Sequence, residues 1–140
     1  MTDRPLYSRV IDQMYDNDPF SLWLGIERIH EDFGSCTLRM TVREEMLNGF
    51  EFAHGGISYS FADSALAFAC NSHGIQAVSI ETNISHTKKI HLGDVLTAVA
   101  KEEHKTKRIG FYQVRVTNQH NDLVALFKGT VYRTGISWEL

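Results

Sequence analysis

Cysteine, proline and long apolar runs are scarce in this sequence of 140 residues. It has two prolines and two cysteines, and Cys36 and Cys70 lack the spacing of a metal site, so we expect reduced thiols. No apolar run is long enough to span a membrane, and no basic segment followed by an apolar one marks a secretory leader. These absences predict a cytoplasmic protein that does not bind a membrane.

An excess of positive charge is also missing. With 14 basic and 17 acidic side chains the net charge is −3, so the chain has no broad positive field of the kind that attracts nucleic acid. Any phosphate-bearing ligand must therefore meet a local basic cluster. The composition, 43% hydrophobic and 22% charged, is that of one soluble globular domain, small enough to gain burial by association with its own copies.

Hydrophobic periodicity predicts a mixed α+β chain. Helical spacing of apolar residues between Tyr7 and Tyr15, closed by the turn-forming run 16–19, predicts a leading helix. We therefore expect an N-terminal helical segment, residues 1–19, followed by one domain, residues 20–140. Alternation of apolar and polar residues predicts strands near residues 24–29, 36–42, 78–85, 95–100, 111–117 and 124–133.

One long helix is predicted between the second and third strands. Ile57, Phe61 and Phe68 share a helical face, alanines at 62, 65, 67 and 69 favour helix, and Gly74 is typical of a helix end. Turns at 92–94, 105–110 and 118–122 have hairpin-like spacing. A hairpin, a helix and four strands joined by short turns predict an antiparallel sheet wrapped around the helix.

The start of this helix is the sharpest candidate site. His54, Gly55 and Gly56 open it, and Asn48 lies shortly before them. Helix N-termini present unpaired N–H groups and a partial positive charge, and glycine lets a ligand approach the backbone closely. A developing oxyanion would be stabilised there, although glycines at a loop-to-helix turn also have a purely conformational explanation.

Asp63 is the only formally charged residue between Glu51 and Glu81. Its neighbours on the predicted helix are small or apolar, and a carboxylate in such surroundings costs free energy unless it has a partner or a function. We predict that Asp63 is catalytic. The alternative is a structural carboxylate, hydrogen-bonded to a neighbouring strand or subunit.

Basic residues form two short groups. Lys88 and Lys89 follow the third predicted strand, and Lys105, Lys107 and Arg108 lie in a later turn. If neighbouring strands bring both groups to one edge, they could bind a nucleotide phosphate; basic turns are otherwise ordinary solvated surface. The histidines lack metal-ligand spacing and no Gly-x-Ser-x-Gly elbow is present, so neither a metal centre nor a serine hydrolase is expected.

The segment from Asn48 to Cys70, NGFEFAHGGISYSFADSALAFAC, resembles the active-site segment of hot-dog thioesterases of the phenylacetic-acid-degradation (PaaI) type. The resemblance continues through residues 71, 93–94 and 124–129. It implies a hot-dog fold, in which a curved antiparallel sheet wraps around one long central helix. It also implies an acyl-CoA thioesterase acting on small, aryl-acetyl thioesters in phenylacetate degradation, assembled as a homodimer or a dimer of dimers. Coenzyme A is then the leaving group, and no metal or other cofactor is implied.

The resemblance also implies roles for individual residues. The backbone N–H of Gly55 and the side chain of Asn48 would hold the thioester carbonyl, and His54 would support their loop. Asp63, contributed by the other subunit, would act as base or nucleophile. Ser79 stands where some relatives carry a hydroxyl that orients water.

The remaining site predictions concern substrate binding. Gly56 would lie against the substrate, and the rings of Phe50 and Tyr59 would form walls suited to an aromatic acyl group. The pantetheine arm would run between subunits toward the basic residues, of which Lys88, Lys89 and Arg108 are predicted to meet the nucleotide.

Three other functions compete with this interpretation. A hot-dog dehydratase or hydratase would need a histidine paired with an acid in motifs that the sequence lacks. A non-catalytic acyl-CoA-binding protein or sensor remains an alternative, although known sensors of the fold carry an added DNA-binding segment and only residues 1–19 precede the domain here. A thioesterase for short- or medium-chain acyl-CoA is the third.

Overall fold

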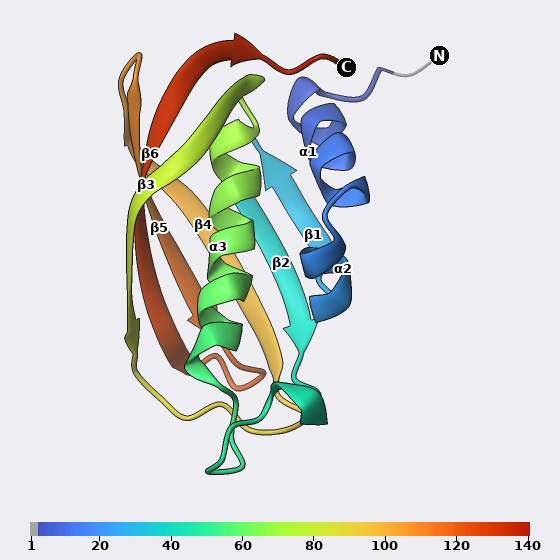
Figure 1. Ribbon diagram of the computed structural model, residues 1–140, viewed down its shortest axis with the longest axis vertical. Helices are drawn as coiled ribbons and strands as arrows, with labels where there is room; N and C mark the ends of the chain where they lie inside the picture. The colour runs from blue at the N-terminus through green and yellow to red at the C-terminus, as the bar shows by residue number, and fades with distance from the viewer. Residues whose placement is uncertain (1–2) are drawn as a thin grey trace.

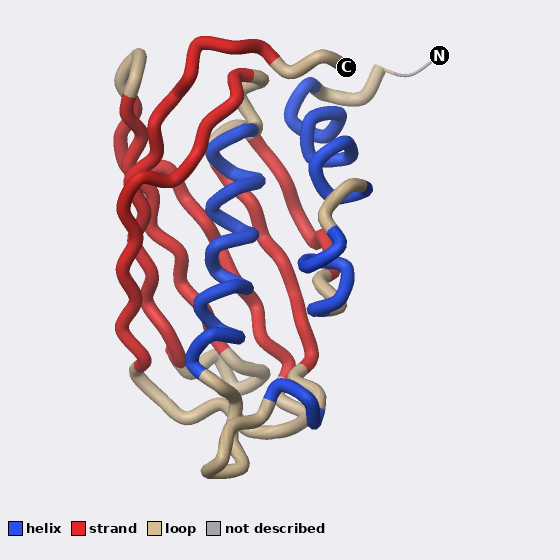
Figure 2. Tube along the Cα trace, in the orientation of Figure 1, coloured by secondary structure: helices blue, strands red, loops and turns tan. Residues whose placement is uncertain are grey.

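A computed structural model describes residues 3–140 and contains one six-stranded antiparallel sheet curved around a long helix (Figures 1 and 2). Residues 1 and 2 of the predicted N-terminal segment lie outside the described residues. The strand order is β1-β2-β4-β5-β6-β3. In chain order the elements are α1 (Leu6–Asp16), α2 (Pro19–Leu24), β1 (Glu27–Asp32), β2 (Ser35–Thr41), η1 (Glu44–Met46), α3 (Gly55–Asn71), β3 (Ile75–His86), β4 (Val95–Lys105), β5 (Ile109–Thr117) and β6 (Leu123–Ser137).

The predicted central helix is confirmed as α3. It buries Phe61 and Phe68 completely against the concave face of the sheet, as the helical stripe in the sequence predicted. Close approach is possible because β6 carries Gly129 there: a Cβ on this residue would lie 2.5 Å from Cδ2 of Leu66. The helix ends before Gly74, whose φ of +87° lies in the region that favours glycine.

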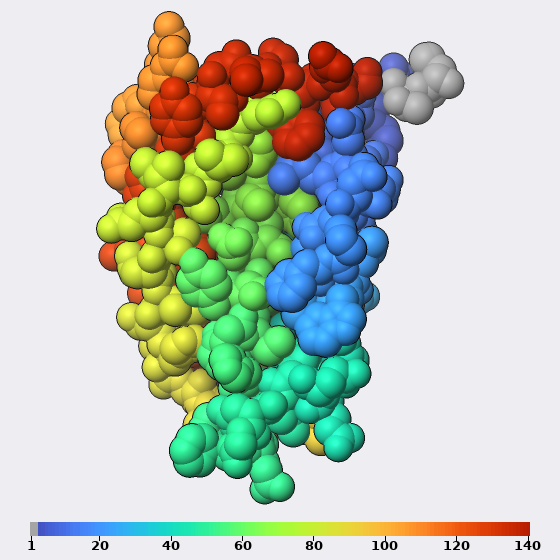
Figure 3. All heavy atoms as spheres, in the orientation of Figure 1, coloured from blue at the N-terminus to red at the C-terminus, as the bar shows by residue number. Residues whose placement is uncertain are grey.

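The N-terminal region differs from the prediction in one element. Residues 19–24 form helix α2, so the strand predicted at 24–29 begins only at Glu27. The run that ends α1 also starts α2, because the side chain of Asp18 accepts a hydrogen bond from the N–H of Ser21 (2.9 Å) and Pro19 occupies the first helical turn. Both helices cover one side of α3 (Figure 3), and Ile11 of α1 is buried in the same core.

The turn at 92–94 does not join a hairpin, which corrects the prediction. β3 pairs with β6 along nearly its whole length and forms the edge of the sheet, so the 87–94 connection passes β6 and β5 before β4 begins. The turn is bonded instead to the residue directly after β2, since the N–H of Gly93 donates to the carbonyl of Val42 (3.0 Å). No helix within residues 3–140 is long and apolar enough to cross a membrane.

Candidate active site

Asn48 shapes the loop that precedes α3. Its side-chain Oδ1 accepts hydrogen bonds from the N–H groups of Phe50 (2.9 Å) and Phe52 (3.4 Å), and its own N–H donates to the carbonyl of Phe52 (2.8 Å). The side-chain amide nitrogen has no hydrogen-bond partner anywhere in residues 3–140. With Oδ1 fixed by the backbone, the NH₂ group of Asn48 is oriented as a free donor.

The first turn of α3 offers a second donor. His54 is the N-cap, and its Nδ1 accepts a hydrogen bond from the N–H of Gly56 (2.8 Å), while the N–H of Ile57 donates to the carbonyl of His54 (2.9 Å). The N–H of Gly55 is left without a partner among the described residues, and the residue is exposed. Unpaired first-turn N–H groups bind anionic oxygen well. His54 therefore caps the first turn, while the N–H of Gly55 remains unpaired among the described residues.

Gly55 and Asn48 line a hollow of about 450 Å³ together with Phe52, Lys88 and Lys89. Two further residues of this hollow have no functional signal in the sequence. The hydroxyl of Ser58 donates to the carbonyl of Gly55 (3.1 Å) and lies 3.3 Å from Nδ1 of His86. A Cβ on Gly55 would lie 3.2 Å from Nε2 of the same ring, so a side chain at this position would have to displace His86 by a few tenths of an ångström.

Asp63 lies about 12 Å farther along α3 than Gly55, from the helical rise of 1.5 Å per residue. Its carboxylate is half-buried, and burial raises its pKa from the usual value of 3.8. No hydrogen bond or ion pair joins it to any residue in the range 3–140. The alternative of a carboxylate held by a neighbouring strand therefore finds no partner in the described part of the chain.

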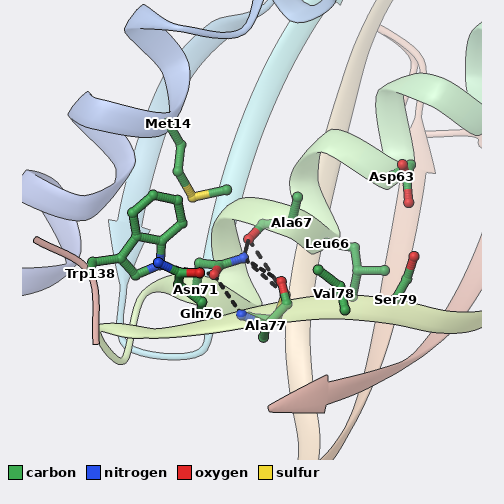
Figure 4. A pocket seen from close by; sticks show the side chains of 11 residues that line it. Met14, Asp63, Leu66, Ala67, Asn71, Gln76, Ala77, Val78, Ser79 and Trp138 are labelled. Atoms are coloured by element: carbon green, nitrogen blue, oxygen red, sulfur yellow. Dashed lines mark hydrogen bonds between the residues drawn. The ribbon is translucent and has the colours of Figure 1, made fainter. Parts of the chain in front are cut away.

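Asp63 faces a cavity of about 410 Å³ that is separate from the hollow beside Gly55 (Figure 4). Ser79, Ala67 and Cys70 line the same cavity. Burial raises the pKa of the Cys70 thiol to about 12, so this sulfur stays protonated and apolar in character. The cavity is thus a mainly apolar space with one carboxylate.

The two aromatic residues that were predicted to bind substrate lie outside the Asp63 cavity. The ring of Tyr59 packs edge-on against Phe127 at a centroid distance of 5.3 Å, and its hydroxyl shares a hydrogen bond with Thr82. Phe50 is 80% exposed at the tip of the loop and stacks on Phe52. Neither ring lines the Asp63 cavity within one chain.

The two basic groups do not converge on one edge of a single chain, which corrects the conditional prediction. Arg108 precedes β5 at the end of the sheet where β3 starts, whereas Lys88 and Lys89 follow the end of β3, so the length of the sheet separates them. Lys88 forms an ion pair with Asp122 (2.6 Å), and the ammonium of Lys89 lies 5.1 Å from the centroid of Phe52.

Comparison with known proteins shows the family of the chain. The thioesterase superfamily model matches residues 50–125. Acyl-coenzyme A thioesterase PaaI of Escherichia coli (strain K12) is 43% identical over 122 residues, 87% of each chain.

Solved structures show the same relationship. The structure of the E. coli PaaI protein from the phenylacetic acid degradation operon superimposes with a TM-score of 0.92 at 40% identity, covering 94% of this chain and 95% of that one. The structure of smu.793 from Streptococcus mutans UA159 bound to acetyl CoA has a TM-score of 0.78 at 27% identity, covering 81% and 91%. The curved sheet and the central helix are therefore those of a family, and this chain belongs to the hot-dog thioesterases of the PaaI type.

Proposed function

We propose that the protein hydrolyses the acyl-CoA thioesters of small aryl-acetyl acids, phenylacetyl-CoA or hydroxyphenylacetyl-CoA, to the free acid and CoA in phenylacetate degradation. The observation that carries this proposal is the unpaired, half-buried carboxylate of Asp63 beside a mainly apolar cavity of about 410 Å³. An apolar cavity of about 150 Å³ can hold a benzene molecule, so this one has room for a ring and its acetyl arm. The likeness to E. coli PaaI supports the same substrate class.

We infer that each active site is shared by two copies of the chain, in a homodimer or a dimer of dimers. Gly55 and Asp63 lie about 12 Å apart along α3 and face separate hollows, so one chain does not direct them at a single carbonyl. Edge strand β3 exposes Val78 and Ile80, and an exposed, apolar sheet edge favours pairing with another copy. Sedimentation of the active protein tests this; a fully active monomer would contradict it.

The proposed reaction uses two donors and one carboxylate. The N–H of Gly55 and the Asn48 amide polarise the thioester carbonyl and stabilise the oxyanion of the tetrahedral intermediate, which then expels the CoA thiolate. Asp63 of the second copy either takes a proton from the attacking water, which Ser79 helps to orient, or attacks the carbonyl itself to give an anhydride that water hydrolyses. Because a thioester is already activated, the proposal requires neither a metal nor an organic cofactor.

The nucleotide is proposed to lie near Lys88 and Lys89, which border the Gly55 hollow. Arg108 can join the same nucleotide only from another copy, since it lies at the far end of the sheet in its own chain. Phe50, exposed at the loop tip, and Tyr59 would likewise contribute to substrate binding through the interface between copies.

A turnover screen over phenylacetyl-, hydroxyphenylacetyl-, benzoyl- and straight-chain acyl-CoA esters tests the activity. We expect the highest kcat/KM for the aryl-acetyl esters, unchanged after dialysis against a chelator. Binding of these esters without release of CoA would support the non-catalytic alternative, and preference for palmitoyl-CoA would point to a general housekeeping thioesterase.

A further inference from the structure

The cavity beside Asp63 is closed at its far end by two side chains from outside the superfamily core. Met14 comes from α1 and Trp138 follows β6, whereas the superfamily model matches only residues 50–125. In Figure 4, Asp63 and Ser79 lie at the right of the cavity and Met14 and Trp138 at the left. The catalytic carboxylate and the closed end therefore belong to different parts of the chain.

Trp138 is held in place by hydrogen bonds. Its indole N–H donates to Oδ1 of Asn71 (3.0 Å), and its backbone N–H donates to the carbonyl of Gly74 (2.9 Å). Asn71 is itself buried and fixed, because its Oδ1 also accepts from the N–H of Ala77 (2.9 Å) and its amide donates to the carbonyls of Ala77 (3.0 Å) and Ala67 (2.9 Å). The indole ring is thus a wall held against the cavity by a hydrogen bond to a buried, fully bonded amide.

A second hollow lies behind this wall. It measures about 460 Å³ and is lined by Met14 and Trp138 again, with Pro19 and Phe20 of α2 on its other side. Because the same two side chains line both spaces, they separate the Asp63 cavity from the hollow along α1 and α2. The space-filling view shows the C-terminal segment lying against α1 at this end of the molecule (Figure 3).

We propose that Trp138, backed by Met14, sets the maximum length of the acyl group that the enzyme accepts. The inference rests on the proposed thioesterase function. With the carbonyl at Asp63, the acyl group extends along α3 toward Asn71, a distance of about 12 Å by helical rise. A single ring and its acetyl arm fit before the indole, while a long alkyl chain meets it. Removing the indole joins the two hollows and lets a longer chain continue over Phe20.

The test compares Trp138→Ala, Trp138→Phe and Trp23→Ala by kcat/KM over phenylacetyl-CoA and saturated esters from butanoyl- to palmitoyl-CoA. Trp138→Ala should shift the ratio of long-chain to phenylacetyl activity by roughly tenfold or more, the scale of apolar pocket changes. Trp138→Phe keeps a ring in place and should resemble wild type. Trp23 is exposed on α2 and lines neither hollow, so its alanine variant is the matched control and should leave the profile unchanged.

Two further variants keep the inference falsifiable. Met14→Ala opens the same wall without touching the Asn71 hydrogen bonds and should shift the profile in the same direction even if Trp138→Ala fails to fold. Phe20→Ala should change the KM for long-chain esters only when it is combined with Trp138→Ala or Met14→Ala. An unchanged profile in every folded wall variant would overturn the inference while leaving the thioesterase standing; absence of acyl-CoA turnover in wild type would instead overturn the proposed function.

Discussion

Two asparagines, one before α3 and one at its end, are held in opposite ways. Asn48 is half-buried, with its oxygen bonded to the loop backbone and its NH₂ group without a partner among residues 3–140. Asn71 is buried, and its oxygen and nitrogen are both committed to the backbone or to the indole of Trp138. One amide is available to a ligand, whereas the other is used entirely by the fold.

The difference distinguishes a functional residue from a structural one of the same type. A donor without a partner at a solvent-facing helix start can bind a substrate. A buried amide whose hydrogen bonds are all made within the protein stabilises the native state instead. Variants at the two helix ends, and at Asp63 between them, should therefore show which residues determine kcat and which determine the free energy of unfolding.

Asp63→Asn should give the largest effect on rate. The variant keeps the shape of the side chain and loses the base or nucleophile, so kcat should fall by roughly 10²- to 10⁴-fold. Steady-state assays on phenylacetyl-CoA and a circular dichroism spectrum measure this. Turnover close to that of wild type would return Asp63 to the structural interpretation.

Asn48→Ala should follow, with a kcat lower by about 10²- to 10³-fold, the cost of losing one oxyanion donor. The loop also loses two hydrogen bonds, but at a partly exposed site, so we expect only a small decrease in thermal stability. An unaltered kcat would mean that Asn48 serves only to shape the loop.

Asn71→Ala should show the reverse pattern. Truncation removes the Asn71 partner from the buried N–H and carbonyl of Ala77, which costs about 1–3 kcal/mol for each group left unsatisfied. Chemical denaturation should record a clear loss in the free energy of unfolding, while kcat for phenylacetyl-CoA in the folded fraction changes less than in Asn48→Ala. A rate loss larger than that of Asn48→Ala would break the comparison.

The ionisation of Asp63 gives a fourth test. Since burial raises its pKa and the carboxylate is the active form, kcat should fall with decreasing pH at a value above the usual 3.8. The raised pKa also means that the charged form destabilises the folded state, so Asp63→Asn should melt above wild type at pH 7. That gap should close as pH decreases, because a protonated Asp63 carries no burial penalty. Thermal melts of both proteins at a series of pH values measure the sign of the difference in melting temperature and its change with pH.

Neutralising Lys88 and Lys89 together should have the smallest effect. Exposed charge pairs are worth about 0.2–1 kcal/mol each, so KM for a full CoA ester should rise roughly three- to tenfold with little change in kcat. A truncated pantetheine thioester should be nearly unaffected. Lys101→Ala, a change at an exposed lysine of β4, is the control, and equal effects on both substrates would exclude this segment as the nucleotide site.

The elements that could be predicted from the sequence are those set by local periodicity. Alternation in β2, β4, β5 and β6 and the Phe61/Phe68 stripe of α3 each bury one face, so spacing alone indicates them. Helix α2 was missed because a single aspartate followed by proline ends one helix and starts the next. The pairing of β3 with β6 was missed because strand partners far apart in the chain leave no mark in local spacing.

The same limit applies to the site. Gly55, Asn48 and Asp63 stand out by residue type and by their place before and within one helix. The contact between Ser58 and His86 depends on how β3 packs beside α3, and the wall at Trp138 depends on contacts between segments near opposite ends of the chain. Residues that meet only through tertiary packing cannot be recognised from residue type or local spacing.

The position of β3 has a consequence for the order of folding. This strand leaves the ribosome directly after α3, yet the strand that binds it, β6, is synthesised last of the six. Until β6 emerges, β3 has no partner in its own chain, and its apolar edge is open to association with other nascent chains. Pairing across so many residues is slow, so we expect the nascent protein to depend on chaperones more than its small size suggests.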